Sequence, residues 1–213
     1  MTQETLATKS ARVPKIIATL KRAHPDAKLA LNFSSPLELL AALILAAQCR
    51  DDLVNEVTID LFQKYRTVDD WMKLREEDVR RINFYRNKTR SIRGAAVKLV
   101  EEFGGKVPEN LDGLLTLPGV GRKTGNAVLA NAFGQPAIVV DTHTWRLSQR
   151  LGLTKQDEQD NIEADLVKIV PRKDWTKFCH LLQFHGRRVC TARKPNCPNC
   201  SISKLCPWTD KTK

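Results

Sequence analysis

The segment that decides the fold is LPGVGRKTGNAVLANAFG, residues 117–134. It begins with a tight turn in which Gly119 and Gly121 bracket the apolar residue Val120. Glycine permits positive φ angles and lets backbone N–H groups approach a ligand without a Cβ in the way. A helix over 122–133, ended by a glycine, follows directly. The segment therefore predicts a glycine-rich turn that leads straight into a helix N-terminus.

Such a turn is suited to binding an anion. The unpaired N–H groups and the dipole at a helix N-terminus favour negative charge. Val120 is expected to point inward and hold the turn against the core, while Arg122 and Lys123 follow at the start of the helix. The pattern favours a helix-hairpin-helix element that grips a DNA phosphate without reading base sequence. The alternative is an ordinary tight turn between two helices.

The net charge points to a polyanionic partner. The 213 residues include 35 Lys and Arg against 24 Asp and Glu, a net charge of +11. Residues 171–213 hold ten Lys or Arg and two Asp, a net of +8, which leaves +3 for the other 170 residues. Nucleic acid is the first candidate, and a solvated basic surface is the alternative. An interfacial membrane helix is disfavoured because Pro, Gly and Cys interrupt the basic stretch.

Length and hydropathy exclude other classes of protein. A hydrophobic content of 42% is enough for a folded core in one domain or two small ones. The longest apolar run, residues 39–47, has nine residues, whereas a membrane-spanning helix needs about 20. The first fifteen residues lack the apolar stretch of a secretory signal. We expect a soluble cytoplasmic protein with no membrane partner, associated with the nucleoid if the source is bacterial.

The rest of the chain predicts one helix after another, so the fold class is all-α. In the first of these helices, Ser35 is the expected N-cap, Pro36 the first helical residue and Glu38 the third position after the cap. This helix is apolar on every side as far as Gln48, which predicts a buried central position. Residues 137–140 are expected to form an extended connection. Further helices are expected near residues 52–65, 67–79, 87–103, 110–115, 141–150, 159–169 and 175–184.

Lys123 and Asp141 are the candidates for catalysis. On spacing alone, Lys123 is a phosphate contact and Asp141 is the N-cap of the next helix. The alternative role for the lysine is nucleophilic attack on a sugar C1′, which requires an unprotonated amine that is desolvated or close to other cations. A carboxylate nearby stabilises the positive charge that grows on the sugar as a base leaves.

Four of the six cysteines lie within 17 residues as Cys190-x6-Cys197-x2-Cys200-x5-Cys206. In a reducing compartment such a cluster indicates a metal centre rather than disulfides. The spacing leaves two metal centres open, a zinc ion or a [4Fe–4S] cluster, and it favours the cluster because only one C-x2-C pair is present. The other two, Cys49 and Cys179, are expected to be buried structural thiols.

LPGVGRKTGNAVL, followed by VDTHTWR and the four cysteines, closely resembles the endonuclease III family of DNA glycosylase/AP lyases, and the resemblance covers nearly the whole chain from Leu31. It implies a two-lobed all-α fold of the helix-hairpin-helix glycosylases. Residues 29–135 would form a six-helix barrel domain with the hairpin, and residues 1–28 and 136–213 a discontinuous iron–sulfur domain. DNA would bind in the cleft between the lobes, and we expect a monomer.

The resemblance also implies the reaction. Lys123 would attack C1′ of a flipped damaged nucleotide, form a Schiff base as the base leaves, and cut the strand by β-elimination, with Asp141 assisting base departure and proton transfers. The expected substrates are oxidised pyrimidines or abasic sites in duplex DNA. The four cysteines would hold a [4Fe–4S] cluster that keeps a loop in place, with Arg193 and Lys194 in that loop on DNA phosphates. The alternatives are a monofunctional glycosylase for another lesion or a mismatch, and a non-catalytic DNA-binding iron–sulfur protein.

Two further positions correspond to residues that fill the gap left by an extruded base in the family. Gln48 matches the family glutamine. The later loop, typically Gly-Leu-Tyr, reads Asn83-Phe84-Tyr85 here, so Phe84 would be the wedge, unless it is a core aromatic. After the glutamine the family commonly has Ala-Thr-Asp, whereas this chain has Cys49-Arg50-Asp51, and a bulky cation there bears on the range of substrates. His143 either lines the lesion pocket or bonds locally.

Overall fold

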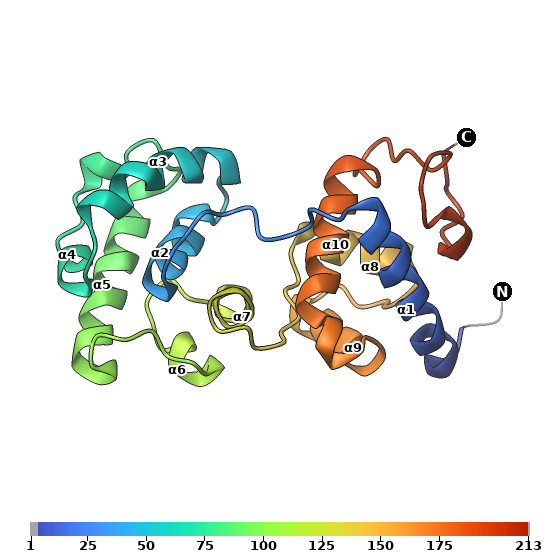
Figure 1. Cartoon of the computed structure of the whole chain (residues 1–213), viewed down its shortest axis with the longest axis horizontal. Helices are drawn as coiled ribbons and strands as arrows, with labels where there is room; N and C mark the ends of the chain where they lie inside the picture. Colours follow the sequence, from blue (N-terminus) through green and yellow to red (C-terminus); the bar gives the residue numbers. More distant parts are fainter. Residues whose placement is uncertain (1–3, 213) are drawn as a thin grey trace. The chain divides into compact units, whose positions relative to one another are not determined.

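The computed structural model describes residues 4–212. These residues form helices joined by loops, with no β-strand among them (Figure 1). The prediction of an all-α fold is confirmed. The α-helices are α1 (Leu6–Ala23), α2 (Pro36–Ala46), α3 (Asp51–Lys64), α4 (Val68–Met72), α5 (Tyr85–Phe103), α6 (Leu111–Leu115), α7 (Arg122–Ala132), α8 (Thr142–Arg150), α9 (Gln159–Ile169) and α10 (Trp175–Arg188). Three short 3-10 helices accompany them: η1 (Glu76–Val79), η2 (Arg172–Asp174) and η3 (Ser203–Leu205).

The chain divides into two compact units. One unit is continuous and runs over Leu29–Gln135, from α2 to α7. The other is discontinuous and combines Met1–Lys28 with Pro136–Lys213, so that α1 packs with α9 and α10. Each unit has its own hydrophobic core.

Helix α2 begins as the sequence predicts. The Ser35 hydroxyl accepts a hydrogen bond from the Glu38 backbone N–H at 3.2 Å, and Pro36 is the first helical residue. The Glu38 carboxylate reaches back to Ser34, where it accepts from the backbone N–H at 2.6 Å and from the hydroxyl at 2.7 Å. The end of the helix differs from the prediction: α2 stops at Ala46, and Gln48 lies in the loop beyond it.

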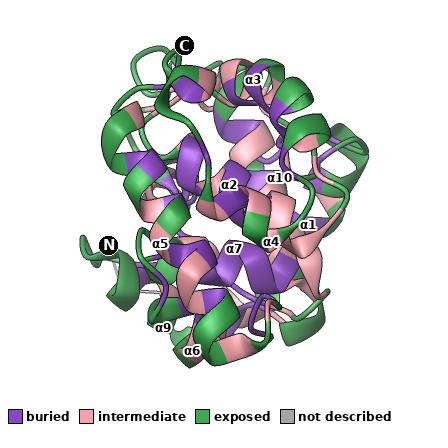
Figure 2. Ribbon diagram, turned by 90° about the vertical axis from the view of Figure 1, so that its left-hand side faces the viewer, coloured by how far each residue is buried: buried purple, intermediate pink, exposed green. Residues whose placement is uncertain are grey.

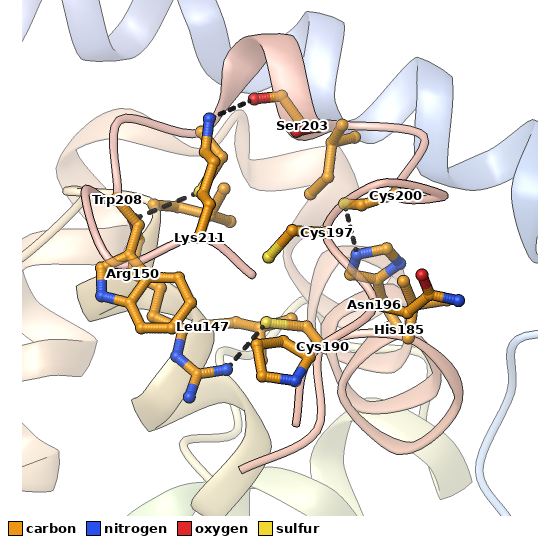
Figure 3. Close-up of a pocket in the computed structure, with 15 residues that line it drawn as sticks. Leu147, Arg150, His185, Cys190, Asn196, Cys197, Cys200, Ser203, Trp208 and Lys211 are labelled. Carbon is orange, nitrogen blue, oxygen red and sulfur yellow. Dashed lines mark hydrogen bonds between the residues drawn. The ribbon is translucent and has the colours of Figure 1, made fainter. Parts of the chain in front are cut away.

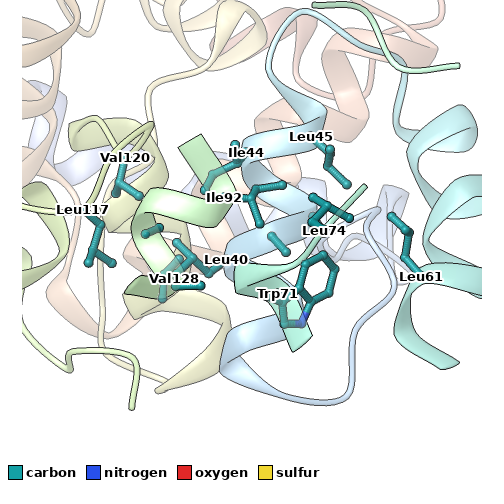
Figure 4. Packing of buried hydrophobic residues seen from close by; sticks show 14 of the residues in the cluster. Leu40, Ile44, Leu45, Leu61, Trp71, Leu74, Ile92, Leu117, Val120 and Val128 are labelled. Atoms are coloured by element: carbon teal, nitrogen blue, oxygen red, sulfur yellow. The ribbon is translucent and has the colours of Figure 1, made fainter. Parts of the chain in front are cut away.

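The core of the continuous unit surrounds α2 and α5 (Figure 4). Leu45 of α2 is fully buried, as expected for a helix that is apolar on every side. Trp71 of α4 is 1% exposed and stacks at a tilt on Tyr65, with ring centroids 5.4 Å apart. Helix α7 is also largely buried, and Figure 2 shows its ribbon mostly in purple. Burial of this apolar area supplies the main driving force for folding of the unit.

The core of the discontinuous unit depends on a helix that the sequence did not predict. Helix α1 is capped by the Thr5 side chain and buries Val13, Ile16 and Leu20. Pro14 lies inside it, and an interior proline normally argues against a helix because it removes an N–H donor. At the other end of the unit, α10 continues four residues beyond the predicted Phe184, to Arg188.

None of the helices in the described part of the chain is both long and apolar enough to cross a lipid bilayer.

Candidate active site and cysteine pocket

The hairpin between α6 and α7 holds its shape through Gly119 and Val120. Gly119 has a φ of +80°, and a Cβ placed there would lie 2.7 Å from the Cβ of Ser91. Both the backbone conformation and the packing therefore require glycine at this position. Val120 is 7% exposed and joins the core, and its N–H donates to the Leu117 carbonyl at 3.1 Å. The expectation that Val120 points inward is confirmed.

Gly121 differs from Gly119. Its φ of −95° and ψ of 177° are extended values that any residue adopts, and a Cβ there would meet no atom within 4 Å. It is the N-cap of α7 and has no side chain to satisfy the first N–H groups of the helix. The fold itself therefore does not require glycine at position 121. The missing Cβ does leave room for a ligand to approach the backbone N–H groups.

Lys123 is exposed on the first turn of α7, two residues after Gly121. Its neighbour Arg122 is exposed as well. Both residues lie at the end of the helix where an anion is favoured.

Asp141 is 9% exposed and is the N-cap of α8, as predicted. Its Oδ1 accepts hydrogen bonds from the backbone N–H groups of His143, at 3.0 Å, and Thr144, at 2.7 Å. Its Oδ2 accepts from the Gln183 side-chain amide at 3.1 Å. Both oxygens are therefore held in fixed positions, so that the carboxylate is oriented before any ligand arrives.

Two residues near this carboxylate, Gln183 and His180, were not predicted from the sequence. They lie three residues apart on α10 and so on one face of the helix. His180 is half-buried, and its pKa falls to about 4 because burial disfavours the imidazolium and Lys177 repels it, while Asp141 acts in the opposite direction. The imidazole is thus neutral at neutral pH. Amphipathic spacing alone gave no signal for either residue.

Gln48 and Phe84 share a rare backbone conformation. They are the non-glycine residues with positive φ in the described part of the chain, with φ values of 53° and 58°. A left-handed conformation costs roughly 1–2 kcal/mol for a residue with a Cβ. Phe84 is 62% exposed, so it is not a core aromatic, and Gln48 is exposed as well. Such strain in two exposed residues is typical of functional sites.

The four clustered cysteines line one pocket (Figure 3). Its wall also includes Ile202 and Trp208. Burial raises the pKa of the Cys200 and Cys206 thiols. The Arg150 guanidinium donates to the Cys190 sulfur at 3.2 Å and stacks over the Trp208 ring at 4.2 Å.

One thiol of this pocket also contacts a histidine. The Cys200 sulfur lies 3.3 Å from Nε2 of His185, whose Nδ1 lies 3.0 Å from Nε2 of His24. Over residues 4–212, no three His, Cys, Asp or Glu side chains are arranged closely enough to hold a metal ion. The donor set around the pocket is nevertheless four thiols, which is the set that an iron–sulfur cluster or a structural zinc takes.

The remaining predicted residues are Arg193, Lys194 and His143. Arg193 and Lys194 are exposed in the loop between Cys190 and Cys197. Arg188, another residue of the basic C-terminal region, pairs with Asp26 at 2.6 Å and is therefore neutralised within the protein. His143 bonds locally, with its Nδ1 3.2 Å from the Arg146 guanidinium.

The two isolated cysteines differ from each other. Cys179 is buried, accepts from the Val139 N–H at 3.2 Å, and has a pKa raised to about 12, as expected of a structural thiol. Cys49 lies three residues beyond the end of α2 and is only half-buried, so the expectation that it is buried was wrong.

Comparisons with known proteins agree with these features. Residues 41–172 match the family described as HhH-GPD superfamily base excision DNA repair protein. The endonuclease III of Synechocystis sp. is 48% identical over 95% of this chain and 94% of its own length. A non-covalent endonuclease III–DNA complex and a trapped endonuclease III–DNA covalent intermediate each superpose with a TM-score of 0.88 and 42% identity, over 93% of this chain and 95% of theirs. The chain belongs to the endonuclease III family.

Proposed function

We propose that the chain excises oxidised pyrimidines from duplex DNA and cleaves the resulting abasic site, with Lys123 as the nucleophile. The observation that carries this proposal is the position of an exposed amine on the first turn of the helix that begins at the glycine hairpin. A phosphate held at that N-terminus brings the sugar of a bound nucleotide close to the lysine. The covalent intermediate trapped with a 42% identical relative supports a lyase that bonds to its substrate.

The proposed reaction first releases the base and then cuts the strand. The unprotonated Nζ of Lys123 forms a bond to C1′ of the extruded nucleotide, and the N-glycosidic bond breaks as the base leaves with its electron pair and takes up a proton. The sugar ring opens to give an imine between Nζ and C1′. Loss of a proton from C2′ then expels the 3′ phosphate and cuts the strand, and water hydrolyses the imine to free the lysine. Because the amine is exposed in the free protein, bound DNA must exclude water from it.

Asp141 is proposed to act as a fixed negative charge near the sugar. Its carboxylate stabilises the positive charge that builds on the ring as the base departs and assists the later proton transfers. Hydrogen bonds from α8 and from Gln183 orient the carboxylate in advance. Preorganisation of this kind avoids the cost of turning a dipole during the reaction.

DNA contacts are proposed on both units. The hairpin residues Gly119, Val120, Gly121 and Arg122 would hold one phosphate, and Arg193 and Lys194 others, while Gln48 and Phe84 fill the space of the extruded base. Most of these contacts reach the backbone rather than base edges. Binding should therefore depend strongly on salt and only weakly on sequence.

The cysteine pocket is proposed to hold a [4Fe–4S] cluster on Cys190, Cys197, Cys200 and Cys206. When bound, the cluster would act as a structural cross-link that fixes the loop carrying Arg193 and Lys194. Four thiols around one pocket, with no carboxylate among the donors, fit this group. Iron and sulfide analysis of the purified protein tests the assignment, and zinc in equimolar amount would contradict it.

Borohydride trapping on duplexes that contain an oxidised pyrimidine or an abasic site tests the proposed activity. We expect a covalent protein–DNA adduct with the unmodified chain and none with Lys123→Ala. Lys123→Arg is the matched control, because it keeps the cation for phosphate binding but has no nucleophilic amine. Base release without an adduct would favour a monofunctional glycosylase, and binding without base release would favour a non-catalytic protein.

A further inference from the structure

We propose that Asn83 is a positioning residue that joins Gln48 and Phe84 into a single wedge, an inference that rests on the proposed function. The side-chain Nδ2 of Asn83 donates a hydrogen bond to the backbone carbonyl of Gln48 at 3.0 Å. The next residue in the chain is Phe84. One side chain therefore ties together the two exposed residues that adopt the left-handed conformation.

The link joins segments that are 35 residues apart in the sequence. Gln48 follows the end of α2, and Phe84 is the N-cap of α5, a helix that packs against α2. A second bond runs in parallel: the buried Lys88 amine donates to the Leu45 carbonyl at 2.8 Å. Two side chains near the start of α5 therefore bind backbone carbonyls near the end of α2. Lys88 binds a carbonyl in the last turn of the helix, and Asn83 binds one in the loop that follows it.

These two bonds have different roles. Lys88 is 6% exposed, so its bond to the end of α2 is part of the core of the unit. Asn83 is exposed, and a hydrogen bond in contact with water adds little to the free energy of unfolding. The effect of the Asn83 bond is therefore local: it fixes the direction of the Gln48 backbone relative to the Phe84 loop. Loss of this bond leaves the core intact and lets Gln48 and Phe84 move independently of each other.

The Asn83 side chain is the group that makes this bond, since its amide N–H reaches the Gln48 carbonyl. With the bond in place, Gln48 and Phe84 enter the duplex together. The gap is then filled and the neighbouring bases are separated in a single step. Without the bond, we expect Gln48 and Phe84 to insert into the duplex independently.

A double-mutant cycle on base extrusion tests this coupling. The readout is the fluorescence of a 2-aminopurine placed beside an abasic site, which reports unstacking separately from strand cleavage. In the wild-type background, Gln48→Ala and Phe84→Ala should be non-additive in the extrusion equilibrium by about threefold or more. In the Asn83→Ala background their effects should become additive.

Two further variants and one independent measurement complete the test. Asn83→Asp keeps the shape of the side chain but replaces its N–H donor with an acceptor oxygen, so it should uncouple Gln48 from Phe84 as Asn83→Ala does. Asn87→Ala removes another exposed asparagine near the start of α5 and should leave the coupling unchanged. Amide hydrogen exchange of the DNA-free protein should speed up around residues 48–50 and 84–85 in Asn83→Ala, with an unchanged unfolding midpoint.

The result that overturns the inference is coupling that survives in both Asn83→Ala and Asn83→Asp. Its failure is distinguishable from failure of the proposed function. In the first case the wild-type chain forms the trapped adduct and extrudes bases, but the coupling ignores Asn83. In the second case the wild-type chain forms no adduct at all.

Discussion

The first turn of α7 and the N-terminus of α8 supply the two proposed catalytic groups in opposite ways. Lys123 is exposed, and the helix that carries it is held by buried residues further along. Asp141 is 9% exposed and accepts three hydrogen bonds, two of which start a helix. The Lys123 side chain should therefore add little to stability, whereas the Asp141 carboxylate stabilises the fold in addition to its proposed chemical role. Substitutions at the two residues should separate these effects.

Lys123→Ala should produce the largest loss. We expect strand cleavage at abasic sites to fall by about a thousandfold or more, as for removal of an enzymatic nucleophile. The free energy of unfolding should stay within about 0.5 kcal/mol of wild type, because the side chain is on the surface. Single-turnover cleavage and urea unfolding measure the two effects. A large drop in stability would refute the contrast with Asp141.

Asp141→Ala should destabilise the discontinuous unit by about 2 kcal/mol, because it removes a helix cap and leaves N–H donors without an acceptor. Asp141→Asn is the informative partner, since asparagine caps helices as well as aspartate does. We expect it to unfold like wild type but to release bases more slowly, because the negative charge is gone. Equal activity of Asp141→Asn and wild type would reduce Asp141 to a structural cap.

His180 should make the surroundings of Asp141 sensitive to acid. The unfolded chain takes up a proton on this histidine near pH 6.5 and the folded chain only near pH 4. Stability that is complete above pH 6.5 is therefore lost as the pH falls toward 4, by at most about 1.4 kcal/mol per pH unit from this group. Urea unfolding at several pH values should show a shallower acid decline for His180→Gln. Identical slopes for both proteins would exclude this role.

Substitutions at the two hairpin glycines should have the smallest effects, and they separate DNA binding from stability. Gly121→Ala meets no atom of the protein, so it should fold normally and weaken DNA binding only about threefold to tenfold, roughly 1 kcal/mol. Gly119→Ala is the control: its φ of +80° and the closeness of Ser91 should lower stability by about 1–2 kcal/mol. Fluorescence anisotropy with an abasic duplex and thermal unfolding distinguish the two. Unchanged affinity of Gly121→Ala would argue against a phosphate at the hairpin.

The sequence predicted those parts of the fold that depend on local chemistry. The cap of α2 at Ser35, the turn at Gly119 and the cap of α8 at Asp141 each follow from the preference of one residue type for one backbone position. Helix α1 was not predicted: Pro14 lies inside it, and its apolar face is buried by packing with α9 and α10. Local rules carry no information about such distant partners.

In the candidate site, too, local features could be predicted from the sequence and long-range contacts could not. Lys123 and the cysteines are visible as motifs, because their spacing is set by one segment. Gln183 and Asn83 act through bonds to residues 42 and 35 positions away, so no window of sequence reveals them. The positive φ of Gln48 and Phe84 was equally hidden, since neither residue type favours it.

The core that includes both Val13 and Ile202 also sets an order of events during synthesis. The Arg12 guanidinium of α1 donates to the carbonyls of Leu151, at 2.9 Å, and Leu205, at 2.8 Å, so its partners are translated long after it. The continuous unit has all of its residues once Gln135 has left the ribosome, and it can fold first. Meanwhile α1 waits with Val13, Ile16 and Leu20 uncovered. These apolar side chains can be covered only after the segment that includes Ile202 has been synthesised.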